Sequence, residues 1–415
     1  MRCSSQTFAG RLCHGDTTRG ELYPRDQTAQ PELYPLTGIR AAAAIWVLLF
    51  HIHAQLVESY PRLEFLITPM VAHGYLGVDL FFILSGFILY YNYAVRLAQV
   101  RVPAVCHFLW MRLARIWPVH AVILILFALL LGVQRLLGMP PTAHPEFYAA
   151  SDFLRNLLLV HSWAVPVKVS WNVPAWSIGC EWLAYLLFPF LVASRLCTRS
   201  ARFSAAVAAL ALVGTALVCQ KLHAVGNADY GVIRIAGEFT AGCALCHMFR
   251  AGLTNRFPWQ YIVPCAIATV FAGSHFVLPA FGLVAYWCVP VLGIIILGLA
   301  HHRCFVSRLC ASKPLLFGGA ISYSMYMVHE VCLTVLKRLG PHFVGVLVPV
   351  VDVLAVITAA AVLYYVVERP CRKAMQNVFS RHNQQSHITH PPGKVVHLPV
   401  AVVRTTESTG GQRAA

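Results

Sequence analysis

Residues 36–51 read LTGIRAAAAIWVLLFH, an apolar run that contains one arginine and one histidine. About 20 apolar residues in a helix cross a bilayer, so this run and the residues after it predict a membrane span near 37–57. Arg40 and His51 are 11 positions apart. At 100° per residue they lie within about 20° of one helix face and about 16 Å apart along the axis. The span therefore carries two ionisable side chains on one face.

Similar apolar runs recur along the chain, which is 58% hydrophobic and 12% charged with a mean hydropathy of +0.65. Soluble proteins contain roughly 25% charged residues, so the composition indicates a membrane protein. We predict an all-α, polytopic integral membrane bundle of about ten transmembrane helices. They lie near 37–57, 72–94, 116–137, 174–193, 203–221, 230–249, 259–277, 281–300, 315–336 and 343–366.

Lysine and arginine gather in alternate loops of this topology, where 24 of the 32 fall on the side of the amino-terminal tail. Loops rich in these residues stay in the cytoplasm, so we expect a multi-pass protein of the inner (cytoplasmic) membrane with both termini cytoplasmic. The net charge of +16 does not indicate nucleic-acid binding, because the basic residues lie in short loops between apolar segments. Membrane lipid is the expected surrounding.

Three regions follow from the polarity of the sequence. Residues 1–35 form a polar cytoplasmic tail, residues 36–372 a membrane domain, and residues 373–415 a second polar tail that we expect to be disordered. Within the membrane domain, Asp152–Trp163 (DFLRNLLLVHSW) is typical of an interfacial amphipathic stretch that could form a lid or entrance. The single C-x-x-C motif has no second pair, so no metal site is predicted.

Other ionisable residues fall inside predicted spans, where each costs on the order of 3 kcal/mol and needs a partner, a wet cavity or a function. Glu181 has no basic residue within a helical turn and must find its partner on another helix. Arg234 and Glu238 are spaced to pair with each other. Asp79, beside small residues, and His329 could serve packing alone, as could His51, and Arg40 could be a simple cytoplasmic anchor.

Seven segments in order resemble acyltransferase family 3, the bacterial membrane O-acyltransferases, over residues 36–372. They are LTGIRAAAAIWVLLFH, GVDLFFILSGF, RLARIWP, WSIGCEWLAYLLFP, RIAGEFTAG, ISYSMYMVH and YYVVERP. Two positions depart from the common pattern, since Ala41 stands where glycine is frequent and Gly237 where proline is frequent. Neither departure touches the residues that would carry the chemistry.

The resemblance implies acyl transfer, most simply of acetyl, from acyl-CoA as co-substrate and without a cofactor. The acceptor would be a hydroxyl of a surface or lipid-linked glycan, or of a small molecule. His51 would act as general base, oriented by Glu181. The residues expected around the substrates are Arg40, Arg112 and Arg115 (the last two in a loop before the third helix), Asp79, Trp176, Ser177, Arg234, Glu238 and His329.

Two other classes compete with this interpretation. A transporter or flippase could use Arg40, His51 and Glu181 as a path without bond chemistry, but the two halves of the chain show no clear repeat. A haem protein would need facing histidines, for which His51 and His329 are the clearest candidates. We favour the acyltransferase over both.

Overall fold

The computed structural model describes residues 31–139, 145–197, 199–222, 228–273, 285–339 and 345–378. These ranges are built of helices and connecting turns, with no strand among them, which confirms the predicted all-α class. Residues 1–30 and 379–415, most of the two predicted tails, lie outside the described residues. The expectation of disorder in the second tail is therefore a prediction about residues that the structure does not describe.

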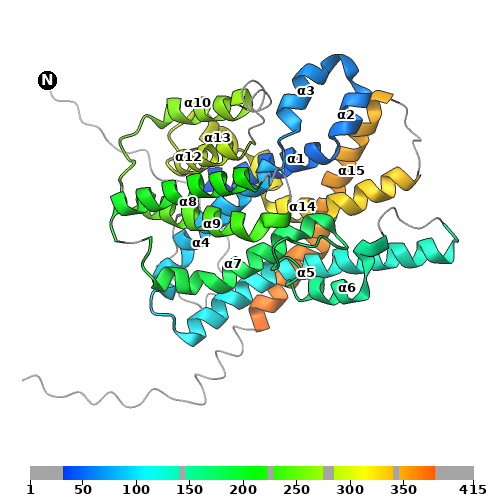
Figure 1. The fold of residues 1–415 in the computed structure, drawn as a ribbon, viewed down its shortest axis with the longest axis horizontal. Helices are drawn as coiled ribbons and strands as arrows, with labels where there is room; N and C mark the ends of the chain where they lie inside the picture. Colours follow the sequence, from blue (N-terminus) through cyan, green and yellow to red (C-terminus); the bar gives the residue numbers. More distant parts are fainter. Residues whose placement is uncertain are drawn as a thin grey trace, which may run out of the picture.

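Helices α5, α8, α9 and α14 run mainly along the long axis of the molecule, α15 crosses them at a steep angle, and α2 and α3 lie at one corner (Figure 1). The helices are α1 (Tyr34–His51), α2 (His53–Ser59), α3 (Glu64–Val71), α4 (Leu76–Leu97), α5 (Val102–Leu136), α6 (Ala150–Leu157), α7 (Trp176–Ala193), α8 (Ala201–Lys221), α9 (Gly231–Arg250), α10 (Trp259–Ala272), α12 (Val289–Ala300), α13 (Phe305–Cys310), α14 (Lys313–Leu339) and α15 (Val348–Leu363). A π-helical segment, Tyr364–Glu368, continues α15.

Each of the ten predicted spans has a helical counterpart in the described chain. Seven helical segments are long and apolar enough to cross a membrane, and α10 and α12 are shorter apolar helices. The remaining counterpart, α14, is 27 residues long but carries several polar side chains on its buried face. The polytopic membrane bundle is confirmed, whereas the number ten stays a prediction.

Helix α5 differs from the prediction because it begins at Val102 instead of near residue 116. The expected loop placement of Arg112 and Arg115 is therefore wrong, since both lie inside the helix. Proline in the first turn suits a helix start, and α5 has Pro103 there. The added turns are held by buried Phe108, whose ring packs 5.3 Å from that of Phe188 in α7.

Glycines set the closest helix contacts of the bundle. A Cβ on Gly86 of α4 would lie 2.0 Å from the carbonyl oxygen of Phe239 in α9, and one on Gly242 would lie 2.0 Å from that of Ile83. At the contact of α1 with α14, a Cβ on Gly319 would lie 2.0 Å from the carbonyl oxygen of Thr37. Small residues allow such backbone approach in membrane bundles, as we predicted from the glycines around Asp79.

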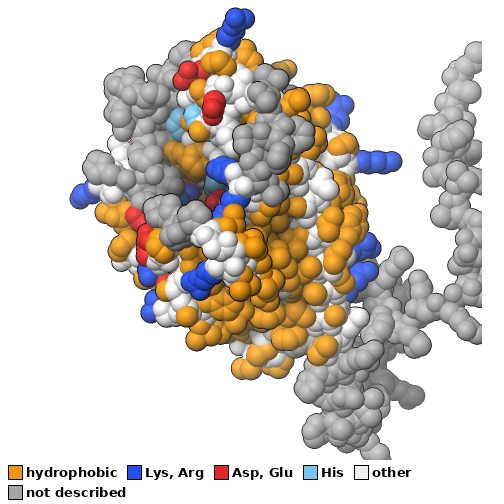
Figure 2. Space-filling model, turned by 90° about the vertical axis from the view of Figure 1, so that its right-hand side faces the viewer, with side chains coloured by type: hydrophobic (Ala, Val, Ile, Leu, Met, Phe, Trp, Pro, Cys, Tyr) orange, Lys and Arg blue, Asp and Glu red, His pale blue; other side chains and the backbone are white. Residues whose placement is uncertain are grey.

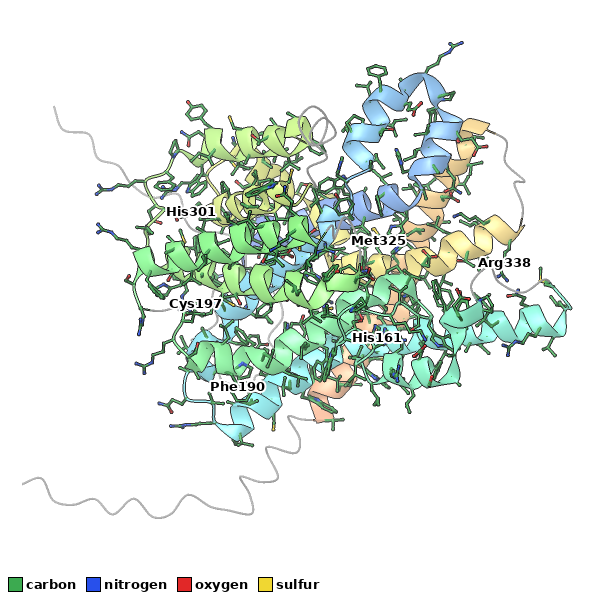
Figure 3. The ribbon with its side chains drawn as sticks, in the orientation of Figure 1. His161, Phe190, Cys197, His301, Met325 and Arg338 are labelled. Atoms are coloured by element: carbon green, nitrogen blue, oxygen red, sulfur yellow. The ribbon has the colours of Figure 1, made fainter. Side chains whose placement is uncertain are left out.

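The amphipathic stretch predicted at 152–163 is helical only as α6. Trp117 of α5 donates from Nε1 to the carbonyl oxygen of Leu157 at 3.0 Å, and a ring nitrogen of His120 bonds the carbonyl oxygen of Asn156 at 2.8 Å. After α6 the chain turns back through His161 toward α7, where the side chains crowd together (Figure 3). Helix α6 is thus anchored along α5.

Candidate active site

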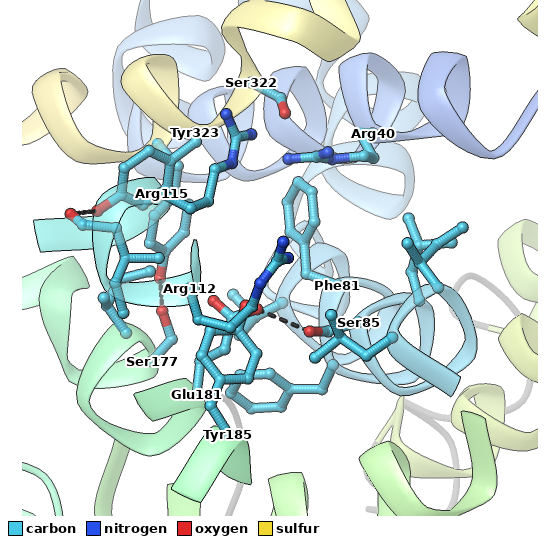
Figure 4. Close-up of a pocket in the computed structure, with 18 residues that line it drawn as sticks. Arg40, Phe81, Ser85, Arg112, Arg115, Ser177, Glu181, Tyr185, Ser322 and Tyr323 are labelled. Carbon is cyan, nitrogen blue, oxygen red and sulfur yellow. Dashed lines mark hydrogen bonds between the residues drawn. The ribbon is translucent and has the colours of Figure 1, made fainter. Parts of the chain in front are cut away.

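A cavity of about 130 Å³ lies among α1, α4, α5, α7 and α14. Its apolar wall comes mainly from α4, and its polar lining comes from all five helices. The polar residues are Arg40, Ser85, Arg112, Arg115, Ser177, Glu181, Tyr185, Ser322, Tyr323 and Tyr326. Figure 4 shows the guanidinium groups of the three arginines pointing toward one open space. The structure therefore brings together five of the predicted site residues from three helices.

The three arginines of the cavity are held differently. Arg115 forms an ion pair with Glu368, while Arg112 lies over the ring of Tyr93 at 5.2 Å and donates to its hydroxyl at 3.1 Å. Within the described residues, no carboxylate lies within ion-pair distance of Arg40 or Arg112. Two guanidinium groups are therefore available to an anionic ligand in the cavity.

Glu368 is a site residue that the sequence analysis did not single out. Its side chain is buried, and besides Arg115 it accepts a hydrogen bond from Ser324 Oγ at 2.7 Å. It ends the π-helical segment, and such segments are frequent at functional sites. The signal available in the sequence was an acidic residue at the end of an apolar run, in the segment YYVVERP. Its partner on α5 could not be read from that signal.

Glu181 projects from α7 into the cavity wall. Its Oε1 accepts from Ser85 Oγ of α4 at 2.8 Å and from the Tyr185 hydroxyl at 2.5 Å. The predicted partner on another helix is thus Ser85. The expected orienting contact with His51 is not found, because the ring of His51 is held instead by the carbonyl oxygen of Val47. Glu181 can therefore act only on a ligand inside the cavity.

His51 is the last residue of α1, so Arg40 and His51 share one continuous helix, as predicted. Its Nδ1 lies 2.8 Å from the carbonyl oxygen of Val47. A carbonyl oxygen only accepts, so Nδ1 carries the hydrogen and Nε2 of the neutral ring keeps its lone pair. A neutral imidazole held in this way can take a proton from a hydroxyl. Nearby His53 bonds Thr68 Oγ1 at 3.1 Å instead.

Tyr326 separates the cavity from His51. It lines the cavity, and its ring lies 5.8 Å from that of His329, which in turn meets the ring of His51 at 4.5 Å. The Tyr326 hydroxyl donates to the carbonyl oxygen of Pro174 at 2.9 Å and accepts from Ser177 Oγ at 2.8 Å. The rings of His51 and His329 are in direct contact, so a haem could not fit between them as the haem interpretation requires. The arginine cavity and the histidine pair are neighbouring compartments.

Comparison with known proteins decides the family. A family model described as an acyltransferase domain matches residues 33–368. The chain belongs to acyltransferase family 3. Acyltransferase MdmB of Streptomyces mycarofaciens is 26% identical over 369 residues, which cover 82% of this chain and 92% of that protein. O-acetyltransferase OatA of Staphylococcus aureus is 21% identical over 364 residues, which cover 81% of this chain and 57% of that protein.

No solved structure matches the chain. The family and its relatives identify the protein as an integral membrane O-acyltransferase. The chain spans little more than half of the length of OatA. The transporter interpretation has no support from these relatives.

One group of predicted site residues lies outside the cavity lining of this acyltransferase. Arg234 donates from Nε and Nη2 to Oδ1 of Asp79 at 3.0 and 2.8 Å and lies 5.2 Å from the ring of Trp176. The predicted pairing of Arg234 with Glu238 is wrong, because the close packing of α4 on α9 brings Asp79 nearer. The carboxylate oxygens of Glu238 are buried and have no hydrogen-bond partner among the described residues. None of these four residues lines the cavity.

Proposed function

We propose that the protein transfers an acyl group, most simply acetyl, from acyl-CoA to a sugar hydroxyl of a cell-surface or lipid-linked glycan. The observation that carries the proposal is the convergence of Arg40, Arg112 and Arg115 on one cavity beside the His51 compartment. The relative OatA is an O-acetyltransferase, which supports acetyl as the group transferred.

Donor binding rests on the charge of the cavity, whose lining carries three guanidinium groups and one carboxylate, that of Glu181. A guanidinium matches phosphate oxygens in two-point hydrogen bonds, and CoA carries phosphates at one end and its thioester at the other. The distribution of lysine and arginine favours an inner membrane protein with both termini in the cytoplasm, so the donor would enter from that side. The helix between Arg40 and His51 then measures about 16 Å, a distance suited to an extended donor.

The chemical step needs one base and one proton donor. His51 Nε2 takes the proton of the acceptor hydroxyl while its oxygen attacks the thioester carbonyl carbon. The new C–O ester bond forms, the C–S bond breaks, and the imidazolium returns the proton to the departing CoA sulfur. General base catalysis of this kind contributes typically about 10²- to 10⁴-fold in rate.

The acceptor would reach His51 from the opposite face. Figure 2 shows one face of the molecule, on which the surface is hollowed and a histidine side chain lies near the hollow. His51 is partly exposed. A hydroxyl of a glycan and a hydroxyl of a small molecule would both satisfy this geometry.

The test is transfer of labelled acetyl from acetyl-CoA to fractionated envelope glycans by the purified protein. His51→Ala should lose about 10²-fold or more of the rate. The matched control is His53→Ala, which removes a histidine two positions away that bonds Thr68 and does not contact His329. Equal rates for wild type and His51→Ala would refute the proposed base, and equal losses in both variants would assign the effect to the fold.

A further inference from the structure

Three metal-ligand side chains meet outside the arginine cavity: His51 of α1, and His329 and Glu330 of α14. One ligand atom from each lies within 4.8 Å of the other two. His329 is 1% exposed, whereas His51 and Glu330 are half-buried. The close packing of α1 on α14 at Gly319 brings these side chains together. The cluster is therefore closed on one side and open on the other.

Both histidines are oriented as metal ligands usually are. Nδ1 of His329 lies 2.6 Å from the carbonyl oxygen of Tyr326, and Nδ1 of His51 lies 2.8 Å from that of Val47. Each Nδ1 must carry its hydrogen, so each neutral ring presents a lone pair at Nε2. Metal-bound histidines typically donate the other ring N–H to a carbonyl or carboxylate in this way. The Nε2 of His329 is buried and has no hydrogen-bond partner among the described residues.

We propose that His51, His329 and Glu330 bind a divalent transition-metal ion, with Zn²⁺ the best match, and that the bound ion inhibits acyl transfer. Two imidazoles and one carboxylate are a ligand set that Zn²⁺ uses, with a fourth position left for water. Ligand bonds of about 2.0–2.2 Å place the ligand atoms about 3.4 Å apart, so small side-chain rotations from the present positions complete the site. The inferred site departs from the sequence-based expectation of no metal.

Inhibition of acyl transfer follows because the ion and the acceptor proton would compete for the same nitrogen, Nε2 of His51. The ion takes up the Nε2 lone pair of His51, which is the lone pair that the proposed base uses. The inhibitory half of the inference thus rests on the proposed function, whereas metal binding itself does not.

The binding test uses the full chain in detergent without any acyl donor. Co²⁺ is titrated as a coloured stand-in, and Zn²⁺ is then added to displace it. Glu330→Gln and His329→Ala should each bind Co²⁺ at least tenfold more weakly than wild type. Glu58→Gln and His53→Ala, which alter residues outside the cluster, should bind like wild type. Glu330→Gln keeps the size of the side chain, so its loss of binding cannot be assigned to misfolding.

Equal Co²⁺ affinity in wild type and Glu330→Gln would overturn the site, as would the near-ultraviolet band of a Co²⁺–thiolate bond. In a second experiment, Zn²⁺ is added to the transfer assay, and each rate is compared with the same variant's rate without metal. The Zn²⁺ concentration that halves the rate should be at least tenfold higher for Glu330→Gln than for wild type. Activation by Zn²⁺, or equal inhibition of both proteins, would overturn the inhibitory role while the binding result stands independently.

Discussion

Arg234 donates two hydrogen bonds to one carboxylate oxygen of Asp79, and both side chains are fully buried. Removing one partner of a buried ion pair leaves the other charge uncompensated, which costs about 3–5 kcal/mol. We therefore expect Asp79→Ala to lower the free energy of unfolding in detergent by up to about that amount, because the buried carboxylate of Glu238 remains near Arg234 and offsets part of the loss. The measurement is an unfolding titration followed by tryptophan fluorescence or circular dichroism.

Lys168→Ala is the matched control for this prediction. Lys168 also pairs with an aspartate, Asp152 at 2.8 Å, but its side chain is 62% exposed, and Arg155 remains as a second partner. Exposed pairs are worth about 0–1 kcal/mol, so this variant should unfold nearly like wild type. A loss for Asp79→Ala no larger than that for Lys168→Ala would contradict a structural role of the buried pair.

The contact of α4 with α9 predicts a difference between two glycines. A Cβ on Gly86 would clash with the backbone of Phe239, whereas one on Gly132 of α5 would meet nothing within 4 Å. Gly86→Ala should therefore destabilise the bundle by about 1–3 kcal/mol through overpacking. Gly132→Ala should be neutral or stabilising by up to about 1 kcal/mol, since alanine favours a helix. Similar stabilities for the two variants would show that α4 and α9 can separate freely.

The features that the sequence could predict are those that depend on the spacing of residues within one helix. Arg40 and His51 lie on one helix, so their common face follows from their spacing and is found in the structure. The partner of Arg234 depends on how closely two helices approach, and spacing within α9 favoured Glu238 over Asp79 on α4. Packing between helices therefore decides the pairs that spacing alone cannot.

The same limit applies to the two compartments of the site. Contacts between α5 and the π-helical segment after α15 join Arg115 to Glu368, and contacts between α1 and α14 join His51 to His329. No short-range sequence pattern encodes either of these contacts. The segments of the family resemblance did contain all four residues, so the set was predictable while the pairing was not.

Donor binding predicts a specific kinetic change for Arg40→Ala. Loss of a charged hydrogen-bonding group costs about 1.5–3 kcal/mol, so the KM for acetyl-CoA should rise about tenfold to 100-fold. Because the group lies far from the reacting atoms, kcat should change much less. Arg308→Ala, which removes an exposed arginine of α13, should leave KM unchanged. An unchanged KM for Arg40→Ala, measured together with direct acetyl-CoA binding, would rule out donor contact.

His161, in the turn between α6 and α7, predicts how stability responds to acid. Burial, aided by neighbouring His120, lowers its pKa from 6.5 to about 4. The unfolded chain therefore binds a proton that the folded chain excludes, so this contribution to stability is present above pH 6.5 and is lost as pH falls through 4. The loss can reach about 3 kcal/mol at 1.36 kcal/mol per pKa unit. Unfolding temperatures measured between pH 7 and 4 should fall less steeply for His161→Gln, and parallel curves would contradict the assignment.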